Sequence, residues 1–348
     1  MEILGNKLSY RTYRHTKVND VDIFLPDIQE RPAFPLESSK DYREIPGEDK
    51  VTYGVAQEAL DLNRDLGNVH RFYHAGPGED KDFGKVILET TDDHKTLLDS
   101  HDIFVEEGAK CNLILSYREK GDLEKFRNSV IRIQAEKNAE VTVFIVQTED
   151  KSVSLESVLV LAEEGAKVRL RQYEMGALKN YMNTQVELLG EKADVDVRSI
   201  YFGHEEDLLN ILYHANHHAR ESNCKMIING ALMDESYKNL KTTLDFKKGS
   251  SKSQGEEAEY TVLLDDEVLN VSVPVLLAHE DDIQGNHAAS SGKIDADLLF
   301  YLKSRGIDHS LAETLIVESK YASTIDLLED QEEKELIWTY FRHRMENR

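Results

Sequence analysis

A motif that recurs at nearly constant spacing constrains the fold of this chain more than any other feature. The motif is an alanine within a charged, turn-like segment, and its copies are centred on Ala109, Ala139, Ala166 and Ala193, 27 to 30 residues apart. After each alanine the sequence alternates, and one face reads Cys111, Leu113, Leu115; Val141, Val143, Ile145; Val168, Leu170; and Val195, Val197. Alternation after a tight turn at a fixed spacing is typical of stacked coils that bury their inner faces against each other. The pattern therefore predicts a mainly β chain that forms a parallel β-helix or a similar solenoid.

Other repeat families of this size fit less well. Tetratricopeptide and ankyrin repeats show a helical period of about 3.6 residues, and hexapeptide β-helices have shorter coils. Residues 242–246 and 260–264 extend the strand-rich pattern beyond the fourth motif. We therefore expect the solenoid core to occupy residues 83–292.

The segments before and after this core differ from it in residue pattern. All prolines except Pro274 lie within the first 77 residues, which predicts an irregular N-terminal region over 1–82 with a helix near 55–65. Residues 293–348 are predicted to be helical. Ile294, Leu298, Tyr301 and Leu302 share one helical face that Gly306 ends, residues 310–313 resemble a capping box for a second helix, and a third helix is expected over 324–342.

Charge and composition exclude several classes of function. The formal charge is −24, with 42 Lys and Arg against 66 Asp and Glu, and no segment carries the dense basic face that nucleic acid or anionic lipid requires. No run of 18 apolar residues occurs, and the first residues lack the apolar core of a signal peptide. These observations favour a cytoplasmic protein that binds neither nucleic acid nor membrane.

Two groups of candidate residues point to weaker hypotheses. His214, His217 and His218 are close in sequence, but strand alternation sends His217 and His218 to opposite faces, so we favour a polar flank over a metal site. The two cysteines are expected to differ. Cys111 falls on the inward face and is expected in the core, whereas Cys224 follows a turn and is expected to be more exposed.

The segment around His287 is the strongest candidate for chemistry. His287 follows the carboxylates Glu280, Asp281 and Asp282 within a stretch of small residues, an arrangement suited to metal binding or proton transfer. The alternative is a histidine that only satisfies local hydrogen bonds. Gly292 and Lys293 do not complete a phosphate-binding loop, because Ile294 stands where that motif places Ser or Thr.

These residues also carry a family resemblance. Residues 274–295 (PVLLAHEDDIQGNHAASSGKID) and 299–307 (LFYLKSRGI) resemble the C-terminal signature of the SufB/SufD family of iron–sulfur cluster assembly proteins. Residues 244–249 (LDFKKG), 255–257 (GEE) and 312–318 extend the likeness, which is strong over about 200–320. The resemblance implies a right-handed parallel β-helix flanked by N-terminal and C-terminal helical regions.

The resemblance also implies a function and partners. Family members are non-enzymatic scaffolds that pair through their β-helices, and each docks a SufC ATPase on its C-terminal helices. For this chain it implies a SufC-type partner, a second subunit that is either SufB-like or another copy, and no tightly bound cofactor beyond a transient cluster at the subunit interface. The docking segment of the family matches residues 300–307, which singles out Phe300, Tyr301 and Arg305.

His287 matches the histidine that the family places at the subunit interface, where we expect it to handle iron or the cluster, with Glu280, Asp281 and Asp282 as oxygen ligands. Gly285 and Ala278 stand where related sequences can carry cysteine, which favours a SufD-like member over SufB. A second hypothesis is a carbohydrate-active β-helix enzyme that uses His287 with Asp281 or Asp282 for acid–base chemistry. The acidic coils and the missing export signal favour the scaffold.

Overall fold

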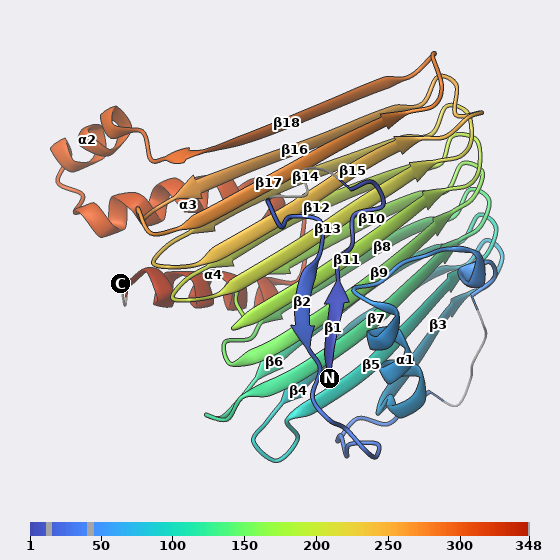
Figure 1. The fold of residues 1–348 in the computed structure, drawn as a ribbon, viewed down its shortest axis with the longest axis horizontal. Helices are drawn as coiled ribbons and strands as arrows, with labels where there is room; N and C mark the ends of the chain where they lie inside the picture. The colour runs from blue at the N-terminus through green and yellow to red at the C-terminus, as the bar shows by residue number, and fades with distance from the viewer. Residues whose placement is uncertain (12–15, 40–44, 347–348) are drawn as a thin grey trace.

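The computed structural model describes residues 1–11, 16–39 and 45–346, and within these residues the chain from Val69 to Lys293 forms a parallel β-solenoid (Figure 1). One eight-stranded parallel sheet in this part of the chain, here called sheet B, contains β3 (Val69–Ala75), β5 (Thr96–Val105), β7 (Lys125–Ala135), β9 (Ser152–Ala162), β11 (Lys179–Leu188), β13 (Leu208–His217), β15 (Tyr237–Phe246) and β17 (Leu269–Ala278). The facing eight-stranded sheet, sheet C, contains β4 (Asp80–Thr90), β6 (Lys110–Glu119), β8 (Glu140–Thr148), β10 (Lys167–Glu174), β12 (Asp194–Gly203), β14 (Asn223–Leu232), β16 (Gln254–Leu263) and β18 (Gln284–Lys293). The expected solenoid is confirmed, although it begins at β3, before residue 83.

The alternation predicted from the sequence forms straight inward rows in sheet C. In-register parallel pairing places Leu113, Val143, Leu170, Val197 and Met226 in one row, and all of them are buried. A neighbouring row contains Cys111, Val141, Val168, Val195 and Cys224.

The prediction that Cys111 is buried is confirmed. The prediction for Cys224 is wrong, because this residue is the inward neighbour of Val195 and is completely buried. Burial raises the pKa of the Cys111 thiol to about 12.

The interior also contains a column of buried polar residues beside the apolar rows. Arg127 donates from Nε to Glu149 at 2.8 Å, and its guanidinium lies 4.1 Å from the ring centre of Tyr117. The members of the column are Asp99, Arg127, Ser129, Glu149, Glu156, Gln172, Glu174, Asn180, Tyr213, Lys238 and Glu259, all buried. Neighbouring coils are joined by contacts such as Tyr213 to Gln172 at 3.0 Å. The hydrogen bonds offset the cost of removing these groups from water.

The N-terminal region packs on the outer face of sheet B. It comprises β1 (Glu2–Gly5) paired antiparallel with β2 (Val21–Phe24), a short 3-10 helix η1 (Glu48–Lys50), and α1 (Gln57–Leu66), which confirms the helix expected near 55–65. Buried apolar residues such as Ile23 and Ala59 join Leu98 and Leu155 of the sheet. Asn63 donates to the carbonyls of Asp99 and Asn128, which ties α1 to the strands below. Residues 12–15 and 40–44 of this region lie outside the described part of the chain.

The C-terminal region contains α2 (Ala296–Ser304), α3 (His309–Ile325) and α4 (Gln331–Glu346), of which α3 and α4 cover sheet C (Figure 1). Tyr321 and Phe341 are fully buried against Phe202 and its neighbours.

Two expectations about these helices are corrected. The carboxylate of Asp308, and not Ser310, caps α3 by accepting from the Leu311 amide, and the third helix begins at Gln331 after a turn, because α3 continues to Ile325. Among the described residues no helix has the length and apolar character needed to cross a membrane.

The two ends of the stack differ. At the first coil, Ser39 donates its amide to the His70 carbonyl, and the hydroxyls of Ser38 and Ser39 accept from the amides of His70 and Phe72. A register shift between Asp82 and Lys85 interrupts the pairing of β4 with β6 and gives the terminal strand β4 a bulge. Such devices protect edge strands from pairing with other chains. At the last coil, β17 and β18 are the terminal strands of their sheets, and no described segment covers their free edges.

Candidate functional site

The last coil is the most exposed part of the solenoid. No residue of β18 is buried, and Val275 is the buried residue of β17. Leu269 of β17 is 61% exposed, and Tyr260 of the neighbouring strand β16 is 48% exposed. An exposed strand edge beside apolar side chains is suited to binding another protein surface.

His287 lies in this coil at the end of an inward row. In-register pairing continues the row of Leu113, Val143, Leu170, Val197 and Met226 through Glu257 of β16 to His287 of β18. Residues that pair in register in a parallel sheet project from the same face. The row therefore changes from apolar to ionisable in the last two coils. His287 is exposed because no further coil covers it.

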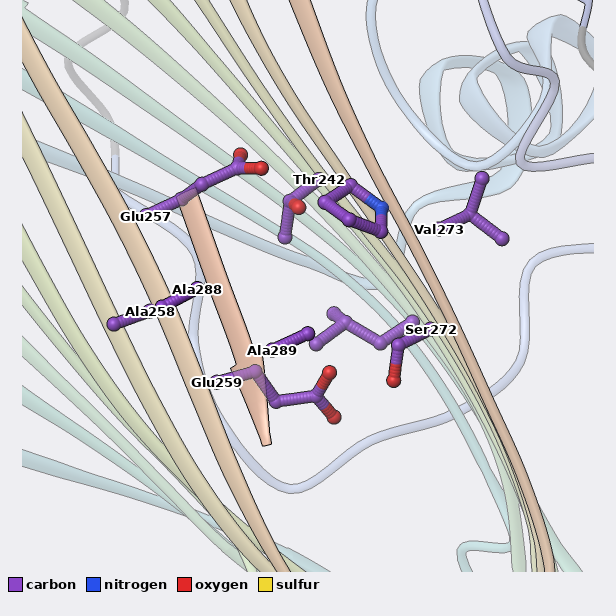
Figure 2. A pocket seen from close by; sticks show the side chains of 10 residues that line it. Thr242, Glu257, Ala258, Glu259, Ser272, Val273, Ala288 and Ala289 are labelled. Carbon is purple, nitrogen blue, oxygen red and sulfur yellow. The ribbon is translucent and has the colours of Figure 1, made fainter. Parts of the chain in front are cut away.

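Glu257 is the buried member of this pair. It is 3% exposed, and neither of its carboxylate oxygens has a hydrogen-bond partner among the described residues. Burial, with a smaller contribution from the Glu259 charge, raises the pKa of Glu257 to about 8. The Thr242 hydroxyl partly offsets this rise. Figure 2 shows the Glu257 and Glu259 side chains extending from β16 toward Thr242 and Ser272. The small pocket beside these side chains, of about 10 Å³, has roughly the volume that a single water molecule needs.

Glu259, two residues further along β16, is neutralised by its neighbours. Lys238 lies within salt-bridge distance of the Glu259 carboxylate and donates to the Ser272 hydroxyl at 3.0 Å. Tyr201 donates to Glu259 at 3.0 Å, and Thr261 donates at 2.9 Å. The cavity therefore lies between one compensated carboxylate and one that has no partner.

The carboxylates expected to act with His287 occupy a different place. Glu280 accepts from the Gly249 amide at 3.0 Å, and Asp282 accepts from the Ser251 hydroxyl at 3.2 Å, so both stabilise the stacking of successive turns. Asp281 is exposed. His287 lies three residues into β18, about 10 Å from the first residue of the strand at roughly 3.3 Å per residue. Within the described residues, no hydrogen bond or ion pair joins His287 to these carboxylates, and no three His, Cys, Asp or Glu side chains are arranged to hold a metal.

The residues expected to dock a partner lie on α2 and at its C-terminal cap, Arg305. The Asp295 side chain caps this helix by accepting from the amides of Asp297 and Leu298, and no residue of α2 is buried. Phe300 and Tyr301 are 74% and 53% exposed, and the Arg305 guanidinium lies 5.3 Å from the ring centre of Tyr301. Figure 1 shows that α2 follows directly after β18, so these exposed residues lie close to the end of that strand.

His217 and His218 project to opposite faces, as strand alternation predicts. His217 is buried, stacks on Phe246 and bonds to Ser222 at 2.8 Å. His218 points outward to Glu187 at 2.5 Å. The prediction that these two side chains face opposite ways is confirmed.

Comparison with known protein families decides the identity of the fold. Residues 87–320 match the family model described as "SUF system FeS cluster assembly, SufBD core domain". The chain belongs to the SufBD family. The matched segment extends from β4 through the solenoid and α2 into α3, and it includes His287, Glu257 and the exposed surface of α2.

Named relatives fall within the same family. The chain is 28% identical to the iron–sulfur cluster assembly protein SufD of Bacillus subtilis over 40% of this chain and 32% of the relative. It is 21% identical to SufD of Escherichia coli over 70% of this chain and 58% of the relative. A SufBD family protein of Mycobacterium tuberculosis is 23% identical over 70% of this chain and 62% of the relative. The matches thus span from about a third to less than two thirds of the relatives' length, and they support a SufD-like member.

Glu257 is the site residue that the sequence reasoning missed. The row predicted from the sequence ends at Val197, although the same spacing continues through Met226, Glu257 and His287. This spacing places an acidic residue, Glu257, in an apolar register position.

Proposed function

We propose that this chain is a non-enzymatic, SufD-like scaffold subunit of the SUF iron–sulfur cluster assembly machinery. In this proposal it pairs with a SufB/SufD-type subunit through the open end of its solenoid and docks a SufC-type ATPase on α2. Iron or a nascent cluster is the cargo of the paired interface, where His287 contacts it transiently. The main support is that a chain with the SufBD core exposes both the last coil and α2 next to each other.

The exposure of α2 supports the docking step. A helix with no buried residue gains little from the rest of the chain, and its apolar surface at Phe300 and Tyr301 favours a protein partner. Aromatic residues and arginine contribute disproportionately to protein interfaces. The Tyr301 and Arg305 pair has this composition.

Copurification with a SufC-type ATPase tests the proposal. We expect the full chain to form a stable complex and to change the ATPase rate of its partner. Phe300→Ala combined with Tyr301→Ala should weaken the complex at least tenfold. Tyr10→Ala is the matched control, because Tyr10 is an exposed aromatic residue of the N-terminal region. Absence of a complex, or equal weakening by the control, would contradict the docking proposal.

A further inference from the structure

We propose that the cleft between the N-terminal region and the outer face of sheet B binds an extended peptide segment of a partner through an arginine side chain. The cleft has a volume of about 1050 Å³. Its walls come from residues 4–9 and 46–58, and from β9, β11, β13, β15 and the turns that follow these strands. The proposed function does not use this surface, so the inference does not rest on that function.

The floor of the cleft is a row of outward-facing polar residues. In-register pairing places Glu187 of β11, Asn216 of β13 and Asp245 of β15 side by side. Glu187 accepts from the side-chain amides of Gln185 at 2.6 Å and Asn216 at 2.8 Å, and it bonds to the His218 ring at 2.5 Å. Asn216 thus directs its amide nitrogen to Glu187. Its Oδ1 has no partner among the described residues, although only 9% of the residue is exposed.

Asp245 supplies a second acceptor beside that of Asn216. One carboxylate oxygen of Asp245 pairs with Lys247, whereas Oδ1 has no hydrogen-bond partner among the described residues. The His279 ring nitrogen is 3.8 Å from this oxygen, which is too far for a hydrogen bond. His214 lines the same cleft, is 9% exposed and has an unpartnered Nε2. Buried polar groups are nearly always hydrogen-bonded, so three unsatisfied atoms in one cleft indicate a site that a ligand completes.

The chemistry of these atoms favours a cationic donor. Asn216 and Asp245 lie on neighbouring strands about 4.8 Å apart, and both present acceptor oxygens. A guanidinium carries its N–H donors in a planar fork that can reach two acceptors at once. Among the described residues of the floor and its turn, two carboxylates, Glu187 and Asp245, face one lysine, Lys247. Charges of opposite sign are equal in number among the other described lining residues, which are Lys7, Lys50, Glu58 and Glu163.

The size and the walls of the cleft favour a peptide over a small molecule. Its volume is at the upper end of the range of roughly 300–1,000 Å³ that small-molecule sites occupy, and a single arginine side chain fills only a small part of it. Leu161, Leu189 and Leu212 add apolar surface, which suits apolar residues on either side of the arginine. The formal charge of −24 also attracts basic segments to the chain.

Titration of the full chain with a synthetic peptide tests the proposal. The probe is a capped peptide of sequence GLRLG, and its partner probe replaces the arginine by citrulline, an uncharged side chain of the same shape. Binding is followed by the methyl resonances of Leu161, Leu189 and Leu212. We expect these resonances to shift with the arginine peptide, and the citrulline peptide to bind at least tenfold more weakly. Equal binding of the two peptides, or binding of neither at millimolar concentration, would overturn the proposal without the need for any variant.

Asp245→Asn should weaken binding of the arginine peptide at least tenfold, because it keeps the shape of the side chain but removes the charge that faces the guanidinium. Glu256→Gln is the matched control and should bind like the wild type. Glu256 is an outward carboxylate of sheet C that pairs with Lys225 at 2.7 Å, much as Asp245 pairs with Lys247 on sheet B. The methyl spectrum of each variant reports its folding separately.

Agmatine, a small free guanidinium, distinguishes a small-molecule site from a peptide site. It should bind at least tenfold more weakly than the arginine peptide, because it lacks the apolar residues that contact the walls. Agmatine binding as tight as that of the peptide, unchanged binding in Asp245→Asn, or equal weakening in Glu256→Gln would each contradict the proposal. No ATPase partner is present in these titrations, so their failure leaves the proposed docking on α2 unaffected.

Discussion

At the scale of single residues, the solenoid depends on a few buried charges that have no access to water. Arg127 is the centre of one such group, with Glu149 at 2.8 Å and Glu156 at 3.5 Å. Burial raises the pKa of Glu149 and Glu156, and the arginine counteracts this rise. Breaking a buried ion pair costs more than its formation contributes, because it leaves an uncompensated charge in the interior.

Arg127→Met should therefore destabilise the chain by about 3–5 kcal/mol, since it leaves Glu149 and Glu156 without their cation. The midpoint of urea unfolding measures the effect. Arg198→Met is the control, because Arg198 pairs with Asp196 on a partly exposed surface and should change stability by less than about 1 kcal/mol. Equal effects of the two changes would show that the buried column is not a principal source of stability.

Glu257 makes stability depend on pH in a defined direction. Its pKa is raised from 4.5 to about 8 in the folded chain, so folding binds a proton between these values and stability falls as pH rises through that range. Glu257→Gln should remove this decline. Relative to wild type, the variant should be similar near pH 4.5 and more stable above pH 8 by a few kcal/mol, at about 1.4 kcal/mol per pKa unit. A difference that does not change with pH, in urea unfolding at both pH values, would contradict the assignment.

At the scale of elements, the helices divide into structural and accessible ones. α3 and α4 bury Val317, Tyr321, Ile337 and Phe341 on the outer face of sheet C, whereas α2 buries none of its residues. The same C-terminal region thus stabilises the solenoid through two helices and presents the third.

Phe341→Ala should cost about 3–5 kcal/mol, because the ring is fully buried and its edge packs on Phe202 and Tyr321 at centroid distances of 5.2 and 5.6 Å. Limited proteolysis should then cut residues 309–346 faster. Leu327→Ala, at a residue 41% exposed, should leave the protection unchanged. Equal protection of the two variants would mean that α4 does not depend on this contact.

The solenoid could be predicted from the sequence because alternation and spacing are local properties that every coil repeats. Helix boundaries were less predictable. The start of α3 depends on which side chain accepts from its free backbone amides, and its continuation to Ile325 depends on which of its faces packs on the sheet. The burial of Cys224 followed from register, which a turn-like local sequence concealed. The grouping of His287 with Glu280, Asp281 and Asp282 stays a prediction. Glu280 and Asp282 bond to the preceding turn, and closeness along an extended chain is not closeness in space.

At the scale of the whole molecule, the stack has one protected end and one open end. The segment before β3 satisfies backbone groups at the first coil, and a bulge interrupts the pairing of β4 with β6. β17 and β18 have no such protection among the described residues, and their exposed surface adjoins α2 (Figure 1). Association with a second subunit is therefore expected at the last coil.

Asn286→Lys together with Ser290→Lys should block that association, because lysines on an edge strand oppose pairing with another chain. Both positions are exposed, so the fold should be retained. Light scattering after size-exclusion chromatography should report a monomer for the variant and a pair for the wild type, alone or with a SufB-like subunit. A variant that still pairs would place the interface elsewhere.

The difference between the two ends also sets the valence of the molecule. A stack with two free ends behaves like a bifunctional monomer and grows into a fibre as concentration rises. Under the proposed pairing, a chain whose first coil is bonded by the segment at Ser38 and Ser39 has a single free end and acts as a chain terminator. The proposed association through the open end would therefore stop at two solenoids, however concentrated the protein becomes.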